Sequence, residues 1–150
     1  MAGVETLTEA SQRDRDTTQV TLTTNQITAN SSVDFKLDSN DSAVDSISYK
    51  PTNASNLKEG LIMMIRVVAT GSSTDTDLTI YEDNSRDAID EVIRLTGISV
   101  NDGTTTIQPG TGDGVQYQNQ QDDSQIYLSA TENSNNPVTL ELRIRWFDVT

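Results

Sequence analysis

The segment "VTLELRIRWFDVT" (residues 138–150) is the most regular apolar stretch of the chain. Its even-numbered residues from Val138 to Trp146 are apolar, and the residues between them are Thr139, Glu141, Arg143 and Arg145. Side chains alternate between the two faces of a β-strand, so this pattern predicts a strand with one face in the core and one in solvent. We therefore expect the last strand to close the core, and its removal to unfold the domain.

Upstream segments repeat this alternation and are separated by turn residues. The apolar faces are Val20 and Leu22 in "TTQVTLTT", Val33, Phe35 and Leu37 in "SVDFKLD", and Leu78 and Ile80 in "TDLTIYE". Shorter candidates are "SISYK", which Pro51 should end, "VQYQNQ" and "QIYLSA". About eight to ten short strands with little helix predict an all-β fold, an antiparallel β-sandwich of the jelly-roll kind.

The segment "EGLIMMIRVVATGSS" (59–73) is apolar at every position from Leu61 to Ile65. At strict period two, one face holds Leu61, Met63, Ile65 and Val67, and the other holds Ile62, Met64 and Val68. Such a segment predicts a central strand. Its second face would meet the edge of the opposing sheet, a loop or another subunit.

Two stretches leave alternatives open. "NSRDAIDEVIRLTGIS" (84–99) fits an amphipathic helix with Ser85 as the N-cap, or a turn followed by a strand at about 91–98. The β-branched residues and Gly97 favour the turn and strand. "VNDGTTTIQPGTGDG" (100–114) contains four turn signals and predicts a loop or a wide hairpin.

The charge balance is strongly acidic, because 23 acidic residues face 10 basic ones and give a net charge of −13. The three lysines are scattered among aspartates, so we expect no nucleic-acid partner. The excess of Asp over Glu and of Arg over Lys resembles proteins of salt-loving organisms. At molar salt the Debye length is about 3 Å, which would screen the self-repulsion of such a chain.

The N-terminal sequence "MAGVETLTEASQRDRD" lacks the apolar core of a secretory signal. The longest apolar run, "LIMMIRVVA", has nine residues and includes Arg66, whereas a bilayer-spanning helix needs about 20. We expect residues 1–16 to form a polar arm and residues 17–150 the sandwich domain, with no signal peptide and no membrane partner. The arm could be terminal disorder or an extension over a neighbouring subunit.

Residues that support catalysis are scarce, because the chain has no histidine and no cysteine. We therefore expect no enzymatic activity and no cofactor; a carboxylate-dependent glycan hydrolase is the least favoured alternative. Loop carboxylates could meet at one end of the sandwich and bind Ca²⁺, although a solvated acidic surface explains them equally well; these are Asp102, Asp113, Asp122 and Asp123.

The second half of the chain also resembles a known kind of module. "DLTIYEDNSRDAIDEVIRLTGIS" (77–99) and "VQYQNQQDDSQIYLSATENSNNPVTLELRIRW" (115–146) are similar to small β-sandwich modules of virion proteins of tailed viruses, including viruses of halophilic archaea. The resemblance implies a structural protein of the capsid surface or tail, most concretely a decoration or turret subunit. It implies a virion location after production in the host cytoplasm, with itself and other virion proteins as partners.

A second possible function is a receptor- or glycan-binding module on a tail or fibre. Tyr81, Tyr117 and Tyr127 could form a stacking platform for sugars, or they could pack against a neighbouring strand or subunit.

Five residues are candidates for contacts between subunits: Arg143 and Arg145 in the last strand, Met64 on the second face of the central strand, and Arg13 and Arg15 in the arm. The two arginines of the last strand either pair with acidic residues of this chain across the strands or contact an acidic neighbouring subunit.

Overall fold

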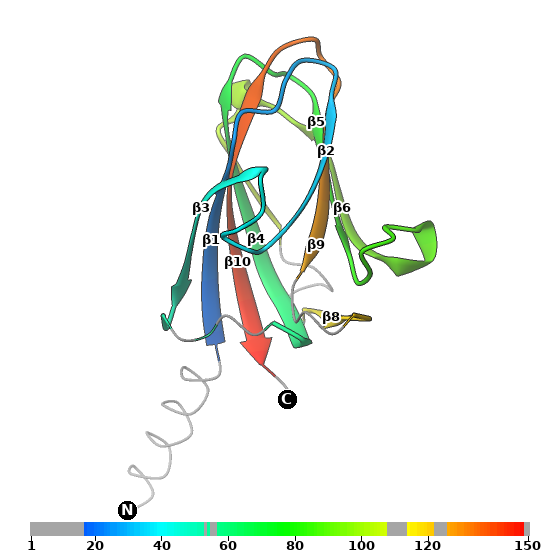
Figure 1. The fold of residues 1–150 in the computed structure, drawn as a ribbon. Helices are drawn as coiled ribbons and strands as arrows, with labels where there is room; N and C mark the ends of the chain where they lie inside the picture. The colour runs from blue at the N-terminus through cyan, green and yellow to red at the C-terminus, as the bar shows by residue number, and fades with distance from the viewer. Residues whose placement is uncertain (1–16, 53, 55–56, 108–113, 122–125, 149–150) are drawn as a thin grey trace, which may run out of the picture.

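A computed structural model describes residues 17–148 except 53, 55–56, 108–113 and 122–125. It consists of two antiparallel sheets packed face to face (Figure 1). Sheet A contains β1 (Thr17–Thr24), β3 (Val44–Lys50), β4 (Glu59–Gly71), β7 (Thr104–Ile107), β8 (Val115–Gln118) and β10 (Val138–Asp148). Sheet B contains β2 (Ser32–Lys36), β5 (Thr76–Tyr81), β6 (Glu91–Ile98) and β9 (Tyr127–Glu132). Two 3-10 turns, η1 (Ala88–Asp90) and η2 (Val100–Asp102), flank β6.

The order of the strands is that of a jelly roll. Sheet A runs β3-β1-β10-β4, with β7 and β8 both on the far edge of β4, and sheet B runs β2-β9-β5-β6. The chain crosses repeatedly between the sheets, which places β10 between β1 and β4 in the middle of sheet A (Figure 1). β3 is an additional edge strand beside β1. The predicted all-β, jelly-roll-like sandwich is therefore confirmed.

The last strand is central to the core, as predicted. The even-numbered residues of β10 from Val138 to Trp146 are each at most 1% exposed. They share the core between the sheets with the alternating residues predicted from the other strands, namely Val20, Leu22, Phe35, Leu37, Leu78 and Ile80. The predicted Val33 is only partly buried. Because β10 pairs along its length with both β1 and β4, its loss would remove two ladders as well as this apolar face.

One end of the core depends on the fit between Trp146 and Gly60. The backbone of Gly60 lies against the indole, and a Cβ at this position would be 2.5 Å from two of its ring carbons. Tyr117 packs edge-on against Trp146, with the ring centroids 5.8 Å apart, and its hydroxyl donates to the Tyr81 carbonyl at 2.9 Å. A bulky aromatic pair thus fills the space that the glycine leaves.

The central strand β4 does not follow strict period two. Its register with β10 shifts, so that Arg145 faces Met64 while Trp146 faces Ile62, and Met63 is the extra residue of a β-bulge. Consequently Ile62 and Ile65 are both buried, and Met63 is not on the face of Ile65 as predicted. The prediction failed because an unbroken apolar run contains no mark of where a bulge interrupts the alternation.

Residues 84–99 form a turn followed by a strand, as preferred, since β6 occupies Glu91–Ile98. The alternative helix capped by Ser85 is wrong: the short 3-10 turn η1 begins after Asp87. Within the part of the chain that the structure describes, no helix is both long and apolar enough to cross a membrane.

Of residues 100–114, the structure describes residues 100–107 and 114, and these are not all loop. The turn at residues 101–103 is present as η2, with Gly103 at a positive φ of 75°. Residues 104–107 form the strand β7, and β8 follows it in the same direction along β4. The wide-hairpin prediction is therefore wrong, because the unpaired edge of β4, which is distant in sequence, provides hydrogen-bond partners that local turn signals do not reveal.

Candidate association surface on the outer face of sheet A

The face of sheet A that points away from sheet B collects basic side chains. Outward residues alternate with the buried ones, and across the register Arg143 of β10 lies between Thr21 of β1 and Arg66 of β4. One step along the strands, Arg145 lies between Gln19 and Met64, and Gln19 in turn faces Lys50 of β3. Four of the ten basic residues of this acidic chain therefore share one face.

The arginines of this face are poorly neutralised within the chain. Arg66 and Arg143 are direct cross-strand partners, and like charges in this arrangement are unfavourable. Glu141 lies 3.6 Å from Arg143, on the same strand. The Nε atom of Arg66 is buried and has no hydrogen-bond partner. Within the described residues Arg145 makes no ion pair, so the centre of the face is locally positive.

Apolar side chains surround these charges. The outward residues Leu61, Met64, Val68 and Phe147 are half-buried, as is Met63 at the bulge. Arg143 itself remains 42% exposed. Methionine and arginine are both enriched in protein interfaces, where Arg combines charge with an apolar stem. The outer face of sheet A thus has the composition of an association surface.

Three of the predicted interface residues, Arg143, Arg145 and Met64, are brought together here. Their role in assembly stays a prediction. The other two, Arg13 and Arg15, lie outside the described residues, as do Asp113, Asp122 and Asp123 of the predicted calcium site. Asp102 is exposed in η2, and the described residues contain no group of three acidic side chains placed to hold a metal ion.

The predicted tyrosine platform is wrong. Tyr117 and Tyr127 are both 0% exposed, and only Tyr81 is partly accessible. Tyr117 is buried against Trp146, and Tyr127 is covered by Arg86, whose guanidinium carbon lies 5.7 Å from the ring centroid. The other possibility in the sequence, that tyrosines pack against neighbouring parts of the chain, is the one found.

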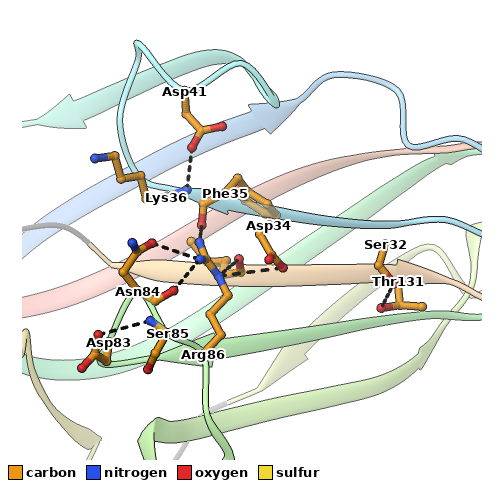
Figure 2. A network of polar contacts seen from close by, with 11 residues as sticks. Ser32, Asp34, Phe35, Lys36, Asp41, Asp83, Asn84, Ser85, Arg86 and Thr131 are labelled. Carbon is orange, nitrogen blue, oxygen red and sulfur yellow. Dashed lines mark hydrogen bonds and ion pairs between the residues drawn. The ribbon is translucent and has the colours of Figure 1, made fainter.

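Arg86 covers part of the outer face of sheet B. The sequence pattern did not identify this residue. Figure 2 shows its side chain lying against β2 and β9. Nε donates to the Leu128 carbonyl at 3.0 Å, and Nη2 donates to the Phe35 carbonyl at 2.8 Å. Nη1 donates to the carbonyl of Asn84. The side chain is 13% exposed, so its charge is almost entirely directed into the protein.

Glu132, like Arg86, is a charged residue whose hydrogen bonds are made within the chain. It lies at the end of the sandwich where the β1–β2, β4–β5 and β9–β10 connections meet. It is 1% exposed, and its carboxylate accepts hydrogen bonds from the hydroxyls of Ser73 and Ser134 and from backbone amides, including that of Asn30. Burial raises the pKa of this carboxyl, but the hydrogen bonds from Ser134, Ser73 and the amides outweigh burial and hold the pKa well below its usual range.

Comparisons with known proteins find solved structures that have a similar arrangement of strands and a low sequence identity to this chain. No protein-family description matches the chain, and no curated protein sequence does. Similar solved structures include the Yersinia pseudotuberculosis-derived mitogen, with 14% identity, 88% of this chain and 87% of that chain covered, and a TM-score of 0.38. Others are broad bean stain virus (12%, 88% and 85%, TM-score 0.44) and Bacillus endospore appendages (6%, 87% and 88%, TM-score 0.40). Similarities this distant carry no conclusion about function.

Proposed function

We propose that this protein is a non-enzymatic structural subunit of a virus particle, assembled as a homo-oligomer. The observation that carries self-association is the outer face of sheet A, where Arg66 and Arg143 oppose each other beside Met64. An acidic surface placed over this face would offset the repulsion between the arginines and remove apolar area from water. Most of the chain's surface charge is acidic, so another copy can provide such a surface.

The assignment to a virus particle is supported by the resemblance of residues 77–99 and 115–146 to sandwich modules of virion proteins. We place the subunit on the capsid surface, as a decoration or turret protein of a tailed virus. The bias toward Asp and Arg supports a host that lives in high salt. Its partners are then further copies of itself and other virion proteins.

Light scattering of the full chain in molar salt tests self-association. We expect an oligomer for the wild type and a smaller particle for the double variant Arg143→Glu/Arg145→Glu, with an unchanged Tm because both side chains point outward. Lys58→Glu is a control charge reversal at an exposed site before β4. An Arg143→Glu/Arg145→Glu protein of wild-type mass and stability would show that these arginines are ordinary surface residues.

The particle assignment is tested separately, by mass spectrometry of virus particles purified through a density gradient and washed. We expect this chain in a fixed ratio to the major capsid protein, and its gene beside genes for a portal or major capsid protein. Its absence from washed particles would contradict the proposal, whatever the oligomeric state of the isolated chain.

A further inference from the structure

The β5–β6 loop (residues 82–90) projects from the sandwich on the side of sheet B (Figure 1). Its tip contains η1, which holds Ile89 90% exposed. Among the described residues, Ile89 is the one large hydrophobic side chain that is exposed. An apolar side chain on a projecting tip is well placed to enter a partner's surface.

The loop is held in position by several hydrogen bonds. The Glu82 amide donates to the Asp90 carbonyl at 2.9 Å and joins the first and last residues of the loop. The Gln120 amide donates to the Glu82 carbonyl at 2.9 Å, and Arg86 ties the middle of the loop to sheet B. Because the loop is already ordered, docking Ile89 would cost little conformational entropy.

The tip is also acidic. Asp87 and Asp90 flank Ala88 and Ile89, and Glu82 and Asp83 begin the loop. The next acidic residue, Glu91, is paired with Arg94 of β6. The one basic residue, Arg86, directs its guanidinium at backbone carbonyls of sheet B. The loop therefore presents an apolar centre surrounded by negative charge.

The outer face of sheet A has the complementary pattern, with the half-buried Met64 beside Arg66, Arg143 and Arg145. That face points away from sheet B, whereas the loop lies on the side of sheet B, so the two surfaces can meet only between two copies (Figure 1). We propose that the β5–β6 loop of one copy docks on the outer face of sheet A of the next, with Ile89 against Met64. This inference rests on the proposed self-association and assigns its two surfaces.

The loop and the receiving face lie on opposite sides of the sandwich, so two copies cannot make both contacts with each other at once. Repetition of the contact therefore produces a ring or an open chain rather than a closed two-fold dimer. This gives a decisive mixing experiment by sedimentation velocity. Ile89→Asp removes the loop's anchor, and Arg143→Glu/Arg145→Glu removes the charges of the receiving face. We expect each protein alone to associate about tenfold or more weakly than the wild type. An equimolar mixture should form a dimer, because each partner retains one intact surface, and should grow no further.

Matched controls separate contact from charge. Thr96→Asp places the same new charge at an exposed position of β6, and Lys58→Glu reverses a charge away from the face; both should assemble as the wild type does. Since the chain has no cysteine, mixing Ile89→Cys with Met64→Cys under mild oxidation should give a disulfide-linked dimer of the two. Neither single variant alone should cross-link to the same extent.

The outcomes distinguish the inference from the function on which it rests. If the wild type assembles and both variants assemble equally well, the two surfaces are wrong while self-association stands. If the variants are monomeric but their mixture also stays monomeric, the loop and the face do not bind each other. A wild type that stays monomeric at all salt and protein concentrations overturns this inference together with the proposed self-association.

Discussion

The outer faces of the two sheets both carry arginine, but the arginines differ in how far their hydrogen bonds are satisfied within the chain. On sheet B, Arg86 donates to the carbonyl of Phe35 (Figure 2) and to that of Leu128. Its side chain is 13% exposed and lies over the ring of Tyr127. On sheet A, Arg66 faces Arg143 across the strands, and its buried Nε has no partner. The outer face of sheet B therefore uses Arg86 to hold the fold together, whereas the arginines on the outer face of sheet A are poorly neutralised.

This difference indicates that the two groups of charges have different roles, one in stability and the other in association. Charges whose hydrogen bonds are complete inside the chain contribute to the stability of the fold, and their removal leaves buried donors or acceptors without partners. Charges without such partners contribute little to stability and are available to a neighbouring molecule. Substitutions at three residues test this difference, namely Glu132, Arg86 and Arg66, and a substitution at Gly60 tests the packed core between the two faces.

The largest effect is expected at Glu132, at the end of β9. Glu132→Ala would leave the hydroxyls of Ser73 and Ser134 and the amide of Asn30 without their acceptor. We expect its Tm to fall by roughly 8 °C or more. Glu132→Gln, which keeps the shape and one acceptor oxygen, should lose less. A Glu132→Ala protein that melts with the wild type would show that this network does not contribute to stability.

Glu132 also predicts how stability depends on pH. Its pKa in the folded protein is lowered, so its contribution is complete above the pKa of the unfolded chain, about 4.3, and is lost as the pH falls below that value. Thermal melts of the wild type should therefore fall more steeply than those of Glu132→Gln between about pH 5 and 3. Parallel curves for the two proteins would exclude a special role for this carboxylate among the many acidic groups.

Next in size is Arg86→Met, which keeps an apolar stem over Tyr127 but removes the donors to two carbonyls. We expect a loss of about 2–4 kcal/mol in the free energy of unfolding, measured by denaturant titration. Arg86→Lys should recover only part of it, because an ammonium cannot reproduce the planar fork. Arg94→Met is the matched control, since Arg94 is exposed on the neighbouring strand β6. Equal losses at Arg86 and Arg94 would mean that the carbonyl contacts of Arg86 stabilise the fold no more than an exposed arginine does.

A smaller loss is expected at Gly60, on the inner face of β4. An added Cβ would lie 2.5 Å from the indole of Trp146 and from the Phe147 carbonyl, so the packing must shift. Gly60→Ala should cost about 1–3 kcal/mol in a denaturant titration. The adjacent outward residue provides the control, and Glu59→Ala should change the free energy of unfolding by less than about 0.5 kcal/mol. A neutral Gly60→Ala would mean that the core end is loosely packed.

The sequence predicts those parts of the fold in which alternation is strict and the partner strand confirms it. The face from Val138 to Trp146 is of this kind. The strand at about 91–98 does not alternate strictly, and its β-branched residues and Gly97 favoured it over a helix. The bulge at Met63 and the strand β7 could not be predicted, because both depend on pairing with strands distant in sequence. An uninterrupted apolar run fits either alternation, and a Thr-rich segment between turn signals looks like a loop.

The candidate surface was only partly predictable for the same reason. The outward position of Arg143 and Arg145 follows from their place between core residues. That Arg66 lies opposite Arg143 requires the β4–β10 register, and the bulge sets which residue faces Arg145. The burial of Tyr127 depends on Arg86, 41 residues earlier in sequence and held at a positive φ of 55°, which no local pattern signals.

The smallest effect on stability is expected at Arg66, on the outer face of sheet A. Arg66→Met keeps an apolar stem between β10 and β7 while removing a buried Nε that has no partner and a charge that opposes Arg143. We expect the free energy of unfolding to change by less than about 0.5 kcal/mol, or to rise, because replacing a poorly compensated charge by an apolar residue is often stabilising. The same protein should associate more weakly in sedimentation, since the receiving face has lost one of its charges. A loss as large as that of Arg86→Met would mean that both faces use their arginines to hold the fold.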